Sequence, residues 1–423
     1  TMNNKGIIFT ALQRFYGALS NLDKFASANN LIDNVVCLDD FFSSFRSTSF
    51  VLQCALAHTE YEPLYDKFRQ KYLIGNRVCK WMVETRNEVE KQHPFDLLKQ
   101  VYVTIYTPVS ATILKSEILT VENDVEYQTL VESLKDELKK INTVEVHFSL
   151  DFRFRKADDN ADLYNDICAA IIIMTNMLKD MYSTIGDCTE LCDDLIMKIE
   201  ELERKILKSE IIFVDDYVYY ADKDIFEKGD RLIPELPCDN VDVRKMLESY
   251  GVKYPSYDPK EFMKFLAKLH LAIYQKQGRH LMPVIFVIYG NNTCKTIPFD
   301  SSIRTTVYRK VNEIADRVIS DNIKYVTMIH EAYNYKSFQY HMLPYYKRIE
   351  HSNGESIIVQ QIGDGLVPRM MMFDTSKIND PKYVDDVLKN RFDVQCIVEK
   401  SAMYPIYLAI KEKRNRKATR KNN

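Results

Sequence analysis

The sequence is poor in glycine and proline and has no long apolar run. Only 11 of its 423 residues are Gly and 13 are Pro, which excludes collagen-like, linker-dominated and glycine-rich repeat architectures. The longest uncharged apolar block, 167–174, is far shorter than the roughly 20 residues of a membrane-spanning helix. No charged start followed by a long apolar run opens the chain. We therefore expect a cytoplasmic protein that does not bind a membrane.

An overall excess of positive charge is also missing. The formal net charge is -3, although Lys411–Asn423 contains seven basic residues and one acid. This segment carries +6, so the remaining residues carry -9. A protein that coats nucleic acid draws its affinity from neutralised phosphates and is expected to be basic throughout. That class is disfavoured, whereas a local nucleic-acid site is not. We expect the basic tail 411–423 to be disordered.

The nine cysteines are scattered, and their number is odd. This distribution differs from the dense disulfide framework of a small secreted domain, and it favours a reducing compartment. Hydrophobic residues make up 46% and charged residues 28%, an ordinary globular balance. A chain of this length is too long for one core, so we expect more than one domain.

The first 100 residues have the apolar periodicity of helices. The pattern predicts helices over 7–26, 31–58 and 64–92, with Pro63 at the start of the third and Gly75 as its weak point. Three long antiparallel helices joined by short segments favour an all-α bundle over 1–100. Helical pattern returns over 161–183 and 191–208, and helices in 161–208 are candidates to complete that bundle.

Beyond Pro94 the periodicity changes to that of strands mixed with helices. Residues 101–233 are predicted to form a strand-helix insertion with a helical arm, and 234–410 an α+β domain. Expected strands are 101–107, 144–154, 211–220, 283–289, 325–329, 356–361, 370–373, 394–398 and 406–410. Expected helices are 127–140, 241–250, 259–277 and 305–321. The predicted fold class is α+β multidomain, with an N-terminal all-α bundle followed by a mixed α/β region.

One segment, Trp81–Leu98, contains residues suited to cleaving RNA. Arg86 and Asn87 precede His93, and seven positions separate the arginine from the histidine. On a helix these two side chains point within about 20° of each other and lie about 10 Å apart. A guanidinium neutralises a phosphate in the transition state, and an imidazole moves a proton near neutral pH. Asn87 offers a donor and an acceptor to position either group.

The segment resembles the HEPN superfamily, whose signature is an arginine, a polar residue, a short spacer and a histidine on a bundle helix. Arg86, Asn87 and His93 match that signature, with a long spacer and with Pro94 directly after the histidine. The resemblance covers about the first 100 residues. It implies a HEPN-like bundle acting as a metal-independent endoribonuclease without a cofactor. It further implies a homodimer whose motif helices meet in one composite site, and RNA cleaved by 2′-hydroxyl attack to a cyclic phosphate.

Two basic residues are weaker candidates for substrate binding. Arg46 either approaches Arg86 as a second phosphate ligand or pairs with Asp39 or Asp40, and we favour the pairing. Lys91 lies on the motif helix between Asn87 and His93.

Alternatives remain at each level. The Arg86 helix carries several acids, and the alternative interpretation is that its arginine only forms part of a solvated, ion-paired face. A HEPN-like scaffold that binds a nucleotide or a partner without cutting is the competing function. For an active nuclease, the resemblance favours a toxin or antiviral-defence role, with a regulatory partner on the C-terminal domain.

Several other patterns point to no site. Cys188 and Cys192 lack a second pair of metal ligands, and His330-Glu331 lacks the second histidine of a zinc protease motif. We expect no metal. The segment 290–296 lacks the glycine that a phosphate loop needs before its lysine. A tyrosine-rich stretch, 325–346, either packs as core, which we favour, or stacks on unpaired bases.

Overall fold

The computed structural model describes residues 5–27, 31–92, 94–95, 97–121, 126–156, 163–186, 189–209, 213–230, 257–277, 283–299, 303–391, 394–395 and 397–422. The chain is an α+β protein, which confirms the mixed composition expected from the sequence. It divides into two compact units. Unit 1 comprises Thr1–Tyr102, Glu117–Asp136 and Leu150–Val214, and unit 2 comprises Val103–Ser116, Glu137–Ser149 and Asp215–Asn423.

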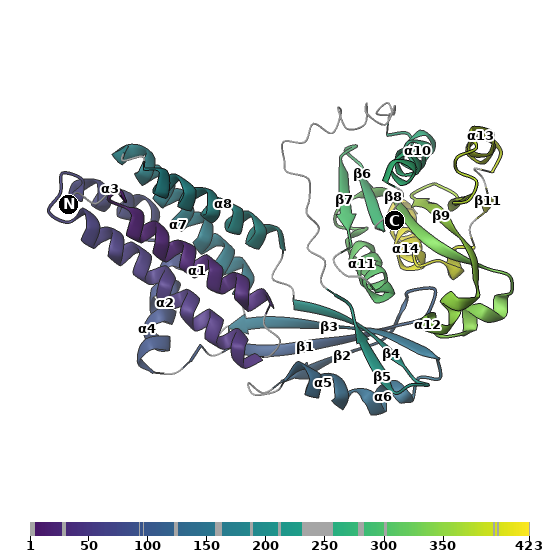
Figure 1. Ribbon diagram of the computed structural model, residues 1–423, viewed down its shortest axis with the longest axis horizontal. Coiled ribbons are helices and arrows are strands. Elements are labelled where there is room, and N and C mark those ends of the chain that lie inside the picture. The colour runs from purple at the N-terminus through teal and green to yellow at the C-terminus, as the bar shows by residue number, and fades with distance from the viewer. Residues whose placement is uncertain are drawn as a thin grey trace. The chain divides into compact units, whose positions relative to one another are not determined.

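Unit 1 is built mainly of packed helices (Figure 1). They are α1 (Phe9–Ser27), α2 (Leu31–Leu56), α3 (Glu62–Tyr72), α4 (Arg77–Lys91), α7 (Leu163–Ile185) and α8 (Glu190–Ser209). Helix α1 packs against α2 and α8, while α7 packs against α3, α4 and α8. The helices at 163–185 and 190–209 thus share one packed body with the four N-terminal helices. Phenylalanines and leucines from α1 and α2 fill its interior.

The single helix predicted over 64–92 is wrong, because the chain forms two helices there. Helix α3 ends at Tyr72, and Gly75 then adopts φ +78°, a left-handed conformation that glycine adopts without steric cost and that turns the chain toward α4. Asn76 then caps α4, because its Oδ1 accepts hydrogen bonds from the backbone N–H groups of Val78 (2.9 Å) and Cys79 (3.3 Å). Gly75 and Asn76 therefore separate the two helices.

The chain also forms a sheet with the strand order β2-β1-β3-β4-β5, as far as the structure describes it. Its strands are β1 (Leu97–Tyr106), β2 (Ile113–Thr120), β3 (Glu145–Lys156), β4 (Phe213–Tyr220) and β5 (Ile225–Lys228). Strands β4 and β5 pair antiparallel. Strand β2 was not predicted, because its residues are almost all exposed and show no apolar alternation. Two short helices, α5 (Tyr127–Ser133) and α6 (Lys135–Lys139), replace the predicted helix over 127–140.

Unit 2 contains a second sheet with the order β11-β10-β9-β8-β6-β7 in the described residues. Neighbouring strands in it pair antiparallel. The strands are β6 (Val284–Tyr289), β7 (Cys294–Pro298), β8 (Ile323–Tyr335), β9 (Ser352–Gly363), β10 (Arg369–Asp374) and β11 (Val394–Gln395). The helices are α10 (Pro259–Gln277), α11 (Arg304–Arg317), α12 (Tyr345–Arg348), α13 (Pro381–Asn390) and α14 (Tyr404–Asn422). Short 3-10 turns lie at Phe338–Met342, Ile349–His351 and Val398–Lys400. The predicted helix over 241–250 lies outside the described residues.

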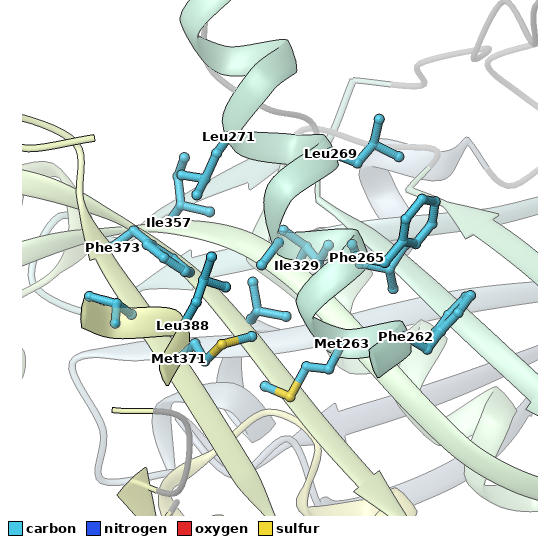
Figure 2. Packing of buried hydrophobic residues seen from close by; sticks show 14 of the residues in the cluster. Phe262, Met263, Phe265, Leu269, Leu271, Ile329, Ile357, Met371, Phe373 and Leu388 are labelled. Carbon is cyan, nitrogen blue, oxygen red and sulfur yellow. The ribbon is translucent and has the colours of Figure 1, made fainter. Parts of the chain in front are cut away.

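Both faces of this sheet are covered by helices, and side chains alternate between two cores. Tyr325 and Ile329 of β8 join residues of α10 and α13 in one core. Figure 2 shows Phe262, Met263 and Phe265 of α10 packed there. Val326 and Met328, on the opposite face of β8, join α11 and α14 in the second core. Its members from outside the strands of this sheet include Tyr106, Ala111, Tyr308, Val311, Met403, Ile406 and Ile410.

The predicted strand over 406–410 and the predicted disordered tail over 411–423 are both wrong, because helix α14 runs to Asn422. Ile406 and Ile410 are one helical turn apart and are both buried, which holds the start of the helix. Lys413 is also buried, and its Nζ donates to the backbone carbonyl of Ile323 (3.2 Å). Arg414 pairs with Asp364 in the turn after β9 (2.8 Å). Tertiary contacts thus hold a basic segment that composition alone marked as disordered.

Candidate functional site

Arg86 lies on α4 at the edge of the helix face that packs into unit 1. Cys79 and Met82, seven and four positions earlier, are buried on the same face. Helix α4 packs against α2 and α7, so this face is held on two sides. The Arg86 side chain is 29% exposed. Its position between core and solvent lets the stem pack while the guanidinium remains in reach of a ligand.

The Arg86 guanidinium contacts two neighbours on its own helix. It forms an ion pair with Glu90, one turn further along α4, and donates from Nη1 to the Oδ1 of Asn87 (3.2 Å). Its Nε is buried and has no hydrogen-bond partner among the described residues. The predicted pair of Arg86 and Asn87 is therefore in contact, and Glu90 offsets the arginine's charge.

His93 lies outside the described residues, but the chain around it is anchored to α2. The backbone N–H of Phe95 donates to Asp39 Oδ1 (3.0 Å). The ring of Phe95 packs on Phe42, with ring centroids 5.0 Å apart. Trp81 of α4 packs edge-on against the same Phe42 ring at 5.5 Å. One aromatic side chain of α2 thus contacts the segments on both sides of the motif.

Asp39 is a titratable group at this site that the motif did not identify. Burial raises the pKa of its carboxyl, the hydrogen bond from Phe95 lowers it, and the nearby Asp40 raises it further. The only signal in the sequence is its position three and six residues before Phe42 and Phe45, which are buried on α2. That spacing identifies the helix face on which Asp39 lies, but it does not predict the hydrogen bond with Phe95.

The two weaker candidates lie in different environments. Arg46 donates from Nη1 to Ser49 Oγ (2.7 Å) on its own helix, and its charge acts on the hydroxyl of Tyr65 in α3. Among the described residues it pairs with neither Asp39 nor Asp40, so the pairing that the sequence favoured is wrong. Lys91 is exposed in the last turn of α4 and makes no ion pair within the part of the chain that the structure describes.

A second polar cluster, in unit 2, was not found from the sequence. Strand β3 buries Glu145, His147 and Ser149 on one face, with apolar residues between them on the other. Such alternation is typical of a strand with one face in water, so sequence gives no sign that the polar face is covered. Within the tyrosine-rich stretch, Tyr325 is fully buried, whereas Tyr345 is 44% exposed and lies beside this cluster.

Comparison of the chain with protein-family models, with curated proteins and with solved structures gives no match. No helix in the described ranges is both long and apolar enough to span a lipid bilayer.

Proposed function

We propose that the protein is a metal-independent endoribonuclease whose site includes Arg86, Asn87 and His93. The observation that carries the proposal is the contact between Arg86 and Asn87 at the edge of a packed helical face. This contact orders a planar cation that matches a phosphate oxygen pair. The role of His93 and the class of reaction are inferred from the resemblance of the motif to HEPN proteins.

The proposed reaction is an internal phosphoryl transfer within RNA. A 2′-oxygen bonds to the adjacent phosphorus, the bond from phosphorus to the 5′-oxygen breaks, and a cyclic phosphate and a 5′-hydroxyl result. His93 moves the proton from the 2′-hydroxyl or to the departing 5′-oxygen. Arg86 neutralises the phosphate as charge builds on its oxygens. To bind Arg86, the substrate phosphate must displace the Glu90 carboxylate from the guanidinium.

The proposal includes a homodimer that pairs through the helical bundle of unit 1, as the resemblance implies. Sedimentation of the purified chain tests the homodimer separately from the reaction. A monomer that cleaves RNA would support the proposed reaction and contradict the composite dimer site.

A non-catalytic nucleotide- or partner-binding scaffold is the second candidate. The ion pair between Arg86 and Glu90 favours it, because a neutralised arginine at i, i+4 from an acid also occurs on ordinary helix surfaces. The two candidate functions differ in that only the nuclease cleaves RNA.

The deciding experiment measures cleavage of single-stranded RNA in EDTA. We expect the wild type to release products with cyclic phosphate ends and His93→Ala to release none. Arg77→Ala is the matched arginine control on the same helix, because the Arg77 side chain is 80% exposed and its Nη2 lies 3.4 Å from Asp166 Oδ1. It should cleave like the wild type, while Arg86→Ala should lose activity. Absence of cleavage by the wild type, or equal cleavage by His93→Ala, contradicts the proposal, and RNA binding without cleavage supports the scaffold.

A further inference from the structure

Unit 2 contains a cluster of polar residues around the first turn of α11. Thr305 of this helix contacts His147 of β3, with Oγ1 and Nδ1 2.9 Å apart. Glu145, two residues earlier on β3, pairs with Arg348 of α12 (3.0 Å). Both members of that pair are nearly buried, at 8% and 6% exposed. Three segments far apart in the chain thus bring their polar side chains together here.

The hydrogen bonds determine which nitrogen of His147 carries its proton. The single hydroxyl hydrogen of Thr305 is donated to the backbone carbonyl of Tyr217 (2.8 Å). Toward His147 the same hydroxyl therefore accepts, so the imidazole donates from Nδ1 and its Nε2 holds a lone pair. Burial, together with the nearby charges of Arg304 and Arg348, lowers the pKa of His147 to about 3, so the ring is neutral near pH 7.

Among the residues that the structure describes, no donor contacts the Nε2 atom of His147. The ring is only 2% exposed, and the nearest acid, Glu145, lies 3.9 Å from Nε2, beyond hydrogen-bond distance. The oxygens of Glu145 accept from Arg348 and from the backbone N–H of Tyr345 (3.1 Å). Within the described residues no group donates to Nε2. A buried acceptor of this kind is costly unless a bound molecule supplies the donor.

Arg304 supplies positive charge beside this acceptor. Its guanidinium lies over the ring of Tyr308 at 5.5 Å, and that ring contacts the ring of His147 at 4.9 Å. No described carboxylate pairs with Arg304, in contrast to Arg309, five residues further along α11, which is paired with Asp216. The helix begins at Arg304 without a side-chain cap, and N–H groups at a helix start favour anions.

We propose that this cluster binds the phosphoryl group of a small phosphorylated ligand. Arg304 and the first turn of α11 take the anionic oxygens, and His147 Nε2 accepts the hydrogen of a protonated phosphate oxygen. The pairing of a cation with a buried proton acceptor matches a hydrogen phosphate or phosphomonoester better than sulfate, which carries no proton near pH 7. The proposal is independent of the endoribonuclease, because all of its residues belong to unit 2.

The test compares inorganic phosphate, a nucleoside 5′-monophosphate and sulfate at equal ionic strength, by calorimetry on the full chain. We expect phosphate to bind at least about tenfold more tightly than sulfate, since one charge-assisted hydrogen bond is worth about 1.4 kcal/mol or more. Tighter binding of the nucleotide identifies a phosphomonoester as the ligand, and tighter binding of inorganic phosphate identifies the free anion. Each of these two outcomes supports the site.

Two variants locate the binding. Arg304→Ala should weaken phosphate binding about tenfold or more. Arg317→Ala removes the same charge at the other end of α11 and should leave binding unchanged. His147→Gln should abolish the preference for phosphate over sulfate while anion binding persists. If that buried variant fails to fold, the two exposed arginine variants still decide the question. No phosphate binding, equal binding of phosphate and sulfate by the wild type, or equal effects of Arg304→Ala and Arg317→Ala overturns the proposal.

Discussion

Removing the cation of the buried ion pair between Arg309 and Asp216 should destabilise unit 2 strongly. The Asp216 side chain is fully buried, and that of Arg309 is 9% exposed. The Asp216 carboxylate accepts from Arg309 Nε (3.0 and 3.1 Å) and Nη2 (2.8 Å), and also from Thr306 Oγ1 (2.8 Å). Arg309→Met keeps a long apolar stem and removes the positive charge that pairs with the buried carboxylate.

The expected cost follows from the desolvated charge that remains. Breaking a buried pair on one side costs about 3–5 kcal/mol, whereas replacing both partners with apolar or neutral groups is much less harmful. The double variant Asp216→Asn/Arg309→Met should therefore be more stable than Arg309→Met alone. Arg391→Met is the matched control, because Arg391 pairs with Asp386 at 3.0 Å with side chains 58% and 39% exposed. Such a surface pair contributes about 0–1 kcal/mol.

Urea denaturation measures the change in the free energy of unfolding, and amide hydrogen exchange measures the local effect in α11 and β4. We expect faster exchange in both elements for Arg309→Met and partial recovery in the double variant. A loss below about 1 kcal/mol for Arg309→Met, equal to that of Arg391→Met, would show that the pair of Arg309 and Asp216 is not desolvated.

Three further predictions concern single positions. Asn76→Ala removes the cap of α4 and should lower the free energy of unfolding by about 1 kcal/mol in urea titrations, with Asn76→Ser nearly neutral. Because the pKa of Asp39 is raised in the fold, ionisation of Asp39 opposes folding above that pKa. Asp39→Asn should therefore be at least as stable as the wild type at pH 7, with the difference shrinking as the pH falls through the raised pKa and vanishing below the lower pKa of the unfolded chain. Asp39→Ala loses the acceptor for Phe95 and should be less stable at all pH values. At Gly363, an added Cβ would lie 2.5 Å from the Cβ of Tyr325, so Gly363→Ala should lower the thermal midpoint by the equivalent of about 1–3 kcal/mol.

The regular elements that depend on local pattern were predictable from the sequence. Helix α10 was expected over 259–277, and the structure places it at Pro259–Gln277. Its apolar residues repeat with the helical period because one face covers a sheet. The strands β6 and β10 were likewise expected, since they are short apolar runs between turn residues.

The remainder depends on contacts between distant residues. The segment 406–410 has β-favouring residues, but the burial of Ile406, Ile410 and Lys413 stabilises a helix there. At the candidate sites, Arg86 and Asn87 were identifiable because they are adjacent in the sequence. His147 and Arg304 were not, because 157 positions separate them and only the fold makes them neighbours.

The lone tryptophan gives the molecule a built-in optical reporter. Trp81 is the only indole in a chain with 27 tyrosines, so excitation at the red edge of its absorption selects it alone. It stands five residues before Arg86 and shares the Phe42 ring with Phe95, the described residues on either side of the motif. Any event that shifts α4 against α2 changes the surroundings of that indole. The fluorescence of the unlabelled protein therefore reports on the part of unit 1 around Trp81, because the tyrosines and phenylalanines of unit 2 are not excited at this wavelength.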